Sequence, residues 1–197
     1  LKPGAVVLDL SVLKQPVLQW AREFFPKNAQ GQEVAYLVGV TPIVNVSGLY
    51  SGSVEVEDAR ADLFDSSEIL IAPDTSCPPE AVQLAEDVAR LMGGKPRFID
   101  PAEHDALIAA TEELPALLGA TLFYTLERSE GWAELQRMVN PTLALAIQSL
   151  RLREREDALA LLSYNRTNVL RHLDNLIARL NEVRGVLAAP PENGELE

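Results

Sequence analysis

Residues 68–100 have the sequence EILIAPDTSCPPEAVQLAEDVARLMGGKPRFID, and this stretch decides the fold class of the N-terminal half. It opens with a short apolar run, Glu68–Ala72, which is typical of a strand buried on both faces. A helix is predicted to begin at Pro78-Pro79-Glu80, because apolar residues then recur at helical spacing until Gly93-Gly94 ends it. Arg97–Asp100 is a second strand candidate. Strand, helix and strand in this order favour an α/β fold with a parallel sheet.

The segments upstream extend the same alternation. Ala5–Leu10 is another short apolar run typical of a buried strand. An amphipathic helix is predicted to start near Pro16 and to stop at Pro26, because proline is tolerated in the first helical turn and ends a helix elsewhere. Tyr36–Val40 is a further strand candidate. After it, residues 45–57 are rich in Gly, Ser and Val without clear periodicity, so that a flexible loop and a hairpin both remain open.

Downstream of Pro101 the strand signals vanish and helical periodicity takes over. One long helix is predicted from about Ala102 to Arg128, with a kink at Pro115. Near the C-terminus, apolar residues repeat in steps of four and three, at Val169, Leu173, Leu176, Leu180, Val183 and Leu187. This C-terminal apolar seam fits a coiled-coil-like partner helix, and equally one face of an intrachain bundle.

Composition and charge exclude several classes of protein. The chain has 17 Lys and Arg against 29 Asp and Glu, a net charge of −12 that repels phosphate backbones, so no nucleic-acid partner is expected. The single cysteine, Cys77, forms no internal disulfide, and with two histidines it leaves too few ligands for a zinc site. We therefore expect no metal and a cytoplasmic location. No apolar run approaches the roughly 18–20 residues that span a bilayer, so no membrane is expected as a partner.

Several motifs give the chain a resemblance to a known family. Residues 59–64 are ARADLF, and a strand candidate ending at Pro73 follows them. Residues 100–105 are DPAEHD, and Leu114-Pro115 comes shortly afterwards. The prephenate and arogenate dehydrogenases show A-R-x-x-L-F, a strand ending in Pro, a Gly after a helix, D-P-x-x-H-D and A-x-x-S-H-L-P-H in the same order. The chain resembles this family over nearly its whole length, most specifically in D-P-x-x-H-D followed by Leu-Pro.

The resemblance implies a domain organisation. It consists of a partial Rossmann-like dinucleotide-binding domain (residues 1–100), an all-helical dimerisation and substrate domain (101–188) and a flexible tail (189–197). The implied cofactor is NAD or NADP, and the implied partner is a second copy in a homodimer formed by the helical domain. Family members carry a G-x-G-x-x-G phosphate-binding loop, which the 197 residues lack. The Gly-rich half of the nucleotide-binding domain is therefore expected to be missing upstream, and the chain alone is expected to be inactive.

The family's catalytic motifs are altered in this chain. D-x-x-S-x-K, whose Ser orients the substrate and the catalytic His, corresponds to DLSVLK, in which Ser11 lies one position early. G-G-H-P, whose His polarises the substrate hydroxyl, corresponds to GVTP, with Thr41 at the His position. A threonine hydroxyl cannot accept a proton near neutral pH, whereas a histidine can. S-H-L-P-H corresponds to EELPA, with Glu113 at its first His. Thr41, Ser11 and Glu113 are thus the predicted catalytic positions.

The resemblance also predicts binding positions. Those for the substrate are Lys14, His104, Arg151 and Arg153. They include cations because prephenate carries two carboxylates. A helix-capping pair at His104 and a solvated basic face at the arginines remain open as alternatives. Asp9 and Pro42 are assigned to the cofactor. A glutamate at position 113 about 4 Å from a substrate carboxylate would cost roughly 4 kcal/mol at an effective dielectric near 20, which argues against an unmodified prephenate site.

Two functions remain open. The first is an oxidoreductase of tyrosine, and hence aromatic amino acid, biosynthesis that oxidatively decarboxylates a small cyclohexadienyl substrate with hydride transfer to NAD or NADP. The second is a catalytically inactive family member that acts as a homodimeric structural or regulatory module. The resemblance as a whole favours the enzyme, whereas the replaced residues favour the module.

Overall fold

The computed structural model describes residues 1–45, 56–151 and 153–189. The chain divides into two compact units, Leu1–Ile108 and Ala109–Glu197. The first is an α/β unit and the second is helical, which confirms the predicted fold class. Most of the predicted loop or hairpin at residues 45–57, and all but the first residue of the predicted tail 189–197, lie outside the described residues.

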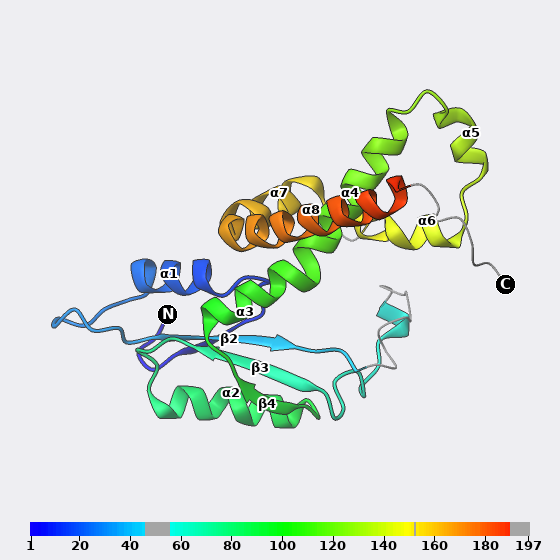
Figure 1. Ribbon diagram of the computed structural model, residues 1–197. Helices are drawn as coiled ribbons and strands as arrows, with labels where there is room; N and C mark the ends of the chain where they lie inside the picture. The colour runs from blue at the N-terminus through cyan, green and yellow to red at the C-terminus, as the bar shows by residue number, and fades with distance from the viewer. Residues whose placement is uncertain (46–55, 152, 190–197) are drawn as a thin grey trace. The chain divides into compact units, whose positions relative to one another are not determined.

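A four-stranded sheet with helices on both faces forms the first unit (Figure 1). The strands lie in the order β1 (Val6–Asp9), β2 (Tyr36–Pro42), β3 (Glu68–Pro73) and β4 (Lys95–Phe98). Helices α1 (Gln15–Phe24) and α2 (Pro79–Leu91) cover opposite faces of this sheet, and η1 (Val56–Asp58) is a short 3-10 turn. All four strands and both helices coincide with the predicted segments to within a few residues.

The sheet is not fully parallel, which corrects the prediction. β1 pairs with β2 and β3 with β4 in parallel, but β2 and β3 are antiparallel. The chain turns back at the end where β2 finishes, since the amide of Ile43 donates to the carbonyl of Glu68 (3.0 Å). An apolar run indicates burial of a strand but carries no information on its direction. The sequence showed no crossover helix between these two strands, and a parallel connection requires such a crossover.

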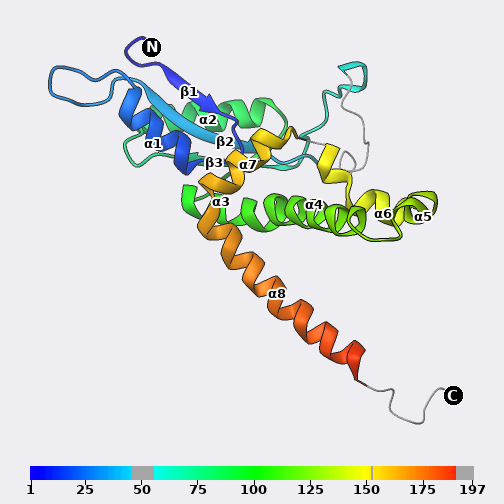
Figure 2. The same cartoon turned by 90° about the horizontal axis from the view of Figure 1, so that it is seen from above.

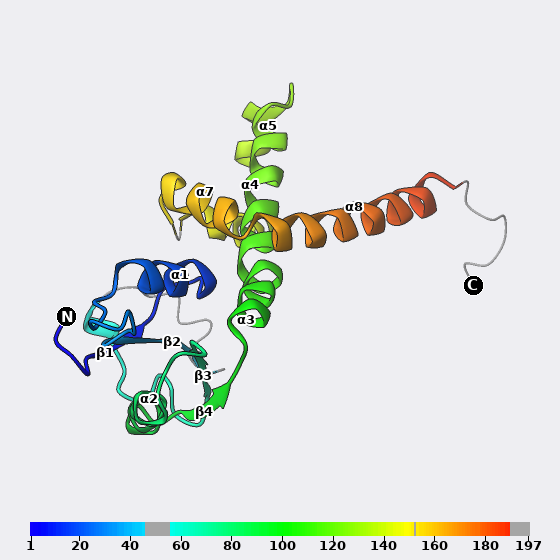
Figure 3. The ribbon, with the colours of Figure 1, turned by 90° about the vertical axis from the view of Figure 1, so that its left-hand side faces the viewer.

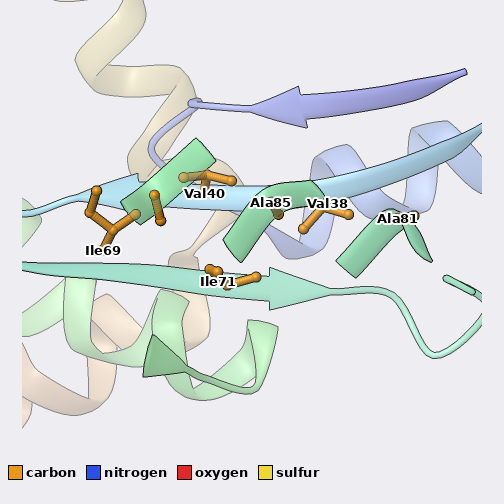
Figure 4. Packing of buried hydrophobic residues seen from close by; sticks show 7 residues of the cluster. Val38, Val40, Ile69, Ile71, Ala81 and Ala85 are labelled. Atoms are coloured by element: carbon orange, nitrogen blue, oxygen red, sulfur yellow. The ribbon is translucent and has the colours of Figure 1, made fainter. Parts of the chain in front are cut away.

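Alternating side chains of the strands supply two small cores. Val38 and Val40 of β2, together with Ile69 and Ile71 of β3, pack against Ala81 and Ala85 of α2 (Figure 4). Leu37 points to the opposite face and contacts Leu18 and Ala21 of α1. This period of two is what a strand buried on both faces requires. Small alanines on α2 allow its backbone to lie close to the sheet.

An ion pair fastens α1 to the end of β3. Arg22 donates through Nε and Nη2 to the two carboxylate oxygens of Asp74, at 2.6 and 2.8 Å. Asp74 is buried, and the guanidinium of Arg22 holds its pKa below the usual value. Two parallel charge-assisted hydrogen bonds fix geometry better than a single contact does.

Replacing Asp74 with asparagine is expected to lower the free energy of unfolding at neutral pH by about 1–3 kcal/mol, the range for hydrogen bonds to charged groups. Because the folded pKa of Asp74 lies below its unfolded value of about 3.9, its contribution is present above that value. The contribution disappears as the pH falls through the folded pKa. Urea denaturation at neutral and acidic pH tests both statements. Asp87→Asn, on the exposed face of α2, serves as the control, and equal losses in both variants would contradict the prediction.

One helical segment runs from Pro101 to Glu127. It consists of α3 (Pro101–Ile108), a π-helical turn η2 (Ala109–Glu113) and α4 (Leu114–Glu127). The π turn immediately precedes Pro115, where a kink was predicted, and such a turn is a common way for a helix to accommodate a lost backbone donor. The 27 residues of the whole helical segment Pro101–Glu127 include an 18-residue window of mean hydropathy 1.4. By length and composition alone this helix is sufficient to cross a membrane, contrary to the expectation from the sequence.

The second unit continues from η2 and α4 as a series of helices. They are α5 (Trp132–Arg137), α6 (Pro141–Ala146), the 3-10 turn η3 (Gln148–Arg151), α7 (Arg155–Tyr164) and α8 (Arg166–Ala188). Gly119 of α4 lies against η3, where a Cβ would meet the Ser149 hydroxyl at 2.6 Å and the Ala146 carbonyl at 2.8 Å. α8 crosses α4 near its own start and then projects away from it (Figures 2 and 3).

This second unit has very few buried apolar side chains. Among its described residues, only Ala109 and Val169 are buried hydrophobics. Along α8 the exposure of the C-terminal apolar seam rises from 5% at Val169 to 54% at Leu180 and 80% at Leu187. Leu118 and Leu122 of α4 are also exposed. Most apolar faces of the helical unit are therefore left uncovered by the residues that the structure describes.

Candidate active site

Several of the predicted site residues of the first unit gather at the carboxyl ends of β1 and β2. Asp9, the last residue of β1, pairs in parallel with Gly39 of β2, and Thr41 lies two residues further along β2. Ligands in open α/β sheets bind at this edge, because loops and helix N-termini diverge there. Pro42 ends β2 next to Thr41 and is half-buried.

Lys14 is buried beneath this edge. Its Nζ donates to three backbone carbonyls, those of Asp9 (3.1 Å), Ser11 (2.6 Å) and Val40 (3.0 Å), and lies 3.5 Å from the Asp9 carboxylate. An ammonium group has three protons, so the three carbonyls use all of them. Burial lowers the pKa of Lys14, and the nearby carboxylates of Asp9 and Asp105 oppose that shift. Lys14 thus ties the loop after β1 to β2, with its charge directed inward.

The aliphatic part of Lys14 needs the glycine at position 39. A Cβ at Gly39 would lie 2.8 Å from Cδ of Lys14 and 3.0 Å from the carbonyl oxygen of Ala72. Such contacts are shorter than van der Waals distances permit. The glycine therefore lets the lysine stem lie flat against β2, and this places the ammonium under the carbonyl of Val40.

Thr41, His104 and Asp105 form a continuous hydrogen-bonded chain. The Thr41 hydroxyl lies 2.8 Å from Nε2 of His104, and Nδ1 of His104 lies 3.0 Å from Oδ1 of Asp105. His104 and Asp105 are 1% and 2% exposed, whereas Thr41 is half-buried. A hydroxyl, an imidazole and a carboxylate in this order are the arrangement that activates hydroxyl groups in many enzymes.

Asp105 also holds the start of α1. Its Oδ1 accepts the backbone amide of Lys14 at 2.8 Å, and its Oδ2 accepts that of Gln15 at 2.9 Å. A carboxylate at a helix N-terminus satisfies amides that have no partner within the helix and is favoured by the helix dipole. Asp105 was not among the predicted site residues. Its place in DPAEHD, next to a histidine, was the signal available in the sequence.

Ser11 lies at the exposed rim of this site. Its hydroxyl contacts the Asp9 carboxylate at 2.7 Å, and its amide donates to the same group at 3.2 Å. Ser11 is exposed, and the neighbouring Val12, at the position where the resemblance places a Ser, is half-buried. The first unit therefore brings Asp9, Ser11, Lys14, Thr41 and His104 to one edge of the sheet.

The other predicted residues lie in the helical unit. Glu113, at the end of η2, is buried and accepts a hydrogen bond from the Asn165 amide at 2.6 Å, while Asn168 donates to the Asn165 carbonyl at 2.8 Å. This group joins η2 to the start of α8. Arg153 pairs with Glu112, and Arg151 is exposed at the end of η3.

Neither a reactive thiol nor a metal centre is evident in the part of the chain that the structure describes. Cys77 donates to the carbonyl of Leu37 at 3.1 Å, and burial raises the pKa of its thiol, which lowers the fraction of reactive thiolate. No group of three or more His, Cys, Asp or Glu side chains is placed to hold a metal ion among these residues.

Comparison with known proteins supports the fold. No protein-family model and no curated protein sequence matches the chain. Among solved structures, Synechocystis arogenate dehydrogenase matches 95% of this chain and 63% of its own, with a TM-score of 0.71 and 18% identity. Prephenate dehydrogenase from Aquifex aeolicus, in complex with hydroxyphenyl propionate and NAD+, matches 93% of this chain and 59% of its own, with a TM-score of 0.73 and 18% identity.

These matches confirm the predicted resemblance at the level of the fold. The fold of an α/β unit followed by a helical unit is shared with both dehydrogenases over almost all of this chain. The chain spans about three fifths of the length of each solved structure. At 18% identity the likeness carries no residue roles, so the site must be interpreted from its own geometry.

Proposed function

We propose that this chain is the later part of an NAD(P)-dependent dehydrogenase that oxidises and decarboxylates a cyclohexadienyl substrate such as prephenate or arogenate. The observation that carries the proposal is the hydrogen-bonded series Thr41, His104 and Asp105 at the carboxyl edge of the sheet. The fold that contains this sheet is shared with two such dehydrogenases. Dehydrogenation of an alcohol requires a group that takes up the hydroxyl proton, and this arrangement supplies one.

The residues present fit only one half of that reaction. Thr41 and His104 suit the uptake of a proton from a substrate hydroxyl. The pyrophosphate of a dinucleotide needs a Gly-rich loop and the N-terminus of the helix that follows it, and no G-x-G-x-x-G occurs in these 197 residues. We assign that part of the site to residues outside this chain. When bound, NAD or NADP would supply the acceptor for the substrate's hydride.

Arg151 is the proposed contact for a substrate carboxylate. The ammonium group of Lys14 donates its protons to backbone carbonyls, and Arg153 pairs with Glu112. Within the described residues Arg151 forms no ion pair and is exposed. The cytoplasmic location and the homodimer implied by the resemblance form part of the same proposal.

The inactive, homodimeric module remains the second candidate. It is favoured by Thr41 and Glu113, which stand where the resemblance places histidines. The position of His104 beside Thr41 weakens this argument, because the imidazole that the β2 position lacks is supplied from α3. The two candidates differ in whether the complete protein turns over substrate.

An assay on the complete protein that contains this chain distinguishes them. Prephenate and arogenate are each tested with NAD+ and with NADP+, and formation of the reduced nucleotide and of carbon dioxide is followed. We expect substrate-dependent turnover with at least one of the four combinations. Absence of turnover in all four, from a folded protein that binds the nucleotide, would support the module.

The 197-residue chain alone is the control. Titration calorimetry is expected to show no dinucleotide binding in the low micromolar range, because the phosphate-binding loop is absent from its sequence. Tight binding of NAD+ or NADP+ by this chain would contradict the assignment of the pyrophosphate site to residues outside it.

A further inference from the structure

We propose that Thr41 and His104 form a proton relay in which the Thr41 hydroxyl touches the substrate and Nε2 of His104 takes the proton, with Asp105 as a positioning residue. The inference rests on the proposed function for its substrate, a secondary alcohol. It replaces the single histidine base expected from the resemblance with two residues, one from β2 and one from α3.

The hydrogen bonds of Asp105 fix which nitrogen of His104 carries the proton. Oδ1 accepts the amide of Lys14, and Oδ2 accepts the amide of Gln15, so both oxygens act as acceptors. With both oxygens accepting backbone amides, the carboxyl group acts as an acceptor also toward Nδ1 of His104 at 3.0 Å, and Nδ1 is the N–H donor of that contact. In the neutral ring the other nitrogen, Nε2, then carries the free lone pair.

That lone pair determines the orientation of the Thr41 hydroxyl. The O–H of Thr41 donates to Nε2 across 2.8 Å, which leaves the lone pairs of Oγ1 to accept a hydrogen bond from a ligand. His104 is 1% exposed and has no access to a ligand of its own, whereas Thr41 is half-buried. A proton from outside therefore reaches the imidazole through the threonine.

The relay accounts for every proton and electron pair of the proposed oxidation. The substrate O–H proton passes to Oγ1 of Thr41 while the Thr41 proton passes to Nε2 of His104. The O–H electron pair forms the carbonyl. An oxidised nicotinamide dinucleotide, held by residues outside this chain, would accept the C–H electron pair as hydride. The resulting dienone loses its ring carboxylate as carbon dioxide, and that bond pair makes the ring aromatic and leaves a phenolate. His104 returns the proton through Thr41 to give the phenol.

Asp105 keeps the imidazole in this state. It is held at both oxygens by backbone amides at the start of α1, so it has little freedom to turn. Its negative charge favours the imidazolium that forms when Nε2 takes the proton, as in hydroxyl–imidazole–carboxylate sites in general. Asp105 acts only through His104 and touches no reacting atom in this scheme.

Nitrogen NMR of the 197-residue chain tests the relay without any activity. The chain has only two histidines, so His172→Gln leaves His104 as the single imidazole. Long-range proton–nitrogen spectra are expected to show Nδ1 protonated and Nε2 bare. Thr41→Val is expected to shift the Nε2 resonance toward that of a nitrogen that accepts no hydrogen bond, and Thr41→Ser to leave it in place. A protonated Nε2, or an Nε2 resonance that ignores Thr41→Val, would overturn the relay.

Kinetics of the complete protein supply the second test. Thr41→Val and His104→Asn are each expected to lower kcat by about 100- to 10,000-fold with little change in KM, the usual effect of losing acid–base catalysis. The double variant is expected to be no slower than the slower single variant, because residues that act as a unit are not additive. Thr41→Ser is expected to retain kcat within about tenfold, since it keeps the hydroxyl.

The outcomes separate the relay from the proposed function. Effects of Thr41→Val and His104→Asn that multiply in the double variant would overturn the relay, while the dehydrogenase assignment would stand. A wild-type protein inactive with all four substrate and nucleotide pairs would overturn the proposed function, and the NMR spectra would then decide whether Thr41 and His104 form one acid–base unit. Melting curves of each variant identify a loss that is due to unfolding.

Discussion

Lys14→Met is expected to lower the free energy of unfolding of the first unit by about 3–5 kcal/mol, the usual cost of removing one partner from a buried charged cluster. Methionine is similar in length but donates no hydrogen bonds. The carbonyls of Asp9, Ser11 and Val40 would remain near one another without the protons that now join them. The Asp9 carboxylate would lose its nearest cation.

Urea denaturation measures this loss. Trp20 of α1 reports on the first unit by fluorescence when Trp132 of the helical unit is replaced with phenylalanine. Lys2→Met is the matched control, because Lys2 is exposed, and a change within about 0.5 kcal/mol is expected. A loss in Lys14→Met no larger than in the control would show that the carbonyls find water or other donors instead.

The location of Lys14 shows which properties of a side chain can be predicted from the sequence and which cannot. From the motif DLSVLK, the prediction assigned the charge of Lys14 to a substrate carboxylate. The structure directs that charge at three backbone carbonyls, one of them on β2. A sequence lists which donors exist but not which backbone acceptors the fold brings within reach.

The elements themselves were predicted well because burial leaves a periodic trace. Both helices of the first unit and all four strands follow from runs of apolar residues, from prolines in first turns and from Gly93-Gly94. The antiparallel pairing of β2 with β3 was missed, since apolar runs look the same in either direction. The mean hydropathy of the helix Pro101–Glu127 was underestimated, because polar residues interrupt its apolar runs.

Individual residues of the candidate site could be proposed from the sequence, but the hydrogen bonds between them could not. Thr41 and His104 were both singled out, yet they stand 63 residues apart and were weighed separately. Considered alone, Thr41 indicated the loss of a base, and His104 was assigned to the substrate, with a helix-capping pair as the alternative. Only the distance of 2.8 Å between them joins the two residues in one candidate acid–base unit. Such a contact between distant positions leaves no local pattern in a single sequence.

The chain is expected to be a homodimer formed by its helical unit, and Leu173→Glu together with Leu180→Glu is expected to convert it to monomer or aggregate. Among the described residues of this unit, the two buried apolar side chains, Ala109 and Val169, are too few to stabilise it, because folding depends on buried apolar area. Each exposed Leu or Val of the seam gains roughly 1.5–3 kcal/mol when it is buried.

A second copy is the occupant that fits these faces. Two apolar faces of the same unit are exposed, one on α4 and one on α8, and a two-fold dimer buries both by bringing the same surfaces of two chains together. Large exposed apolar patches mark interaction sites in soluble proteins, and these two faces are candidates for such a site. Glutamate at positions 173 and 180 would place charges without partners inside that interface, and each such charge costs several kcal/mol.

Light scattering coupled to size exclusion measures the mass of each variant. The matched control is Ala178→Glu with Gly185→Glu, which adds the same two charges to α8 but on the face opposite the seam, where both positions are exposed. A dimer in the control and its loss in the seam variant support the interface. A wild-type chain that stays monomeric at tens of micromolar would contradict it.

Recovery of the chain only in detergent would also contradict the dimer, and would instead assign the apolar helix Pro101–Glu127 to a membrane. We favour the dimer over the membrane because the exposed apolar residues extend onto α8. On that helix they alternate with Arg171, Arg179 and Arg184. This pattern is typical of a helix in water that has one face against another helix.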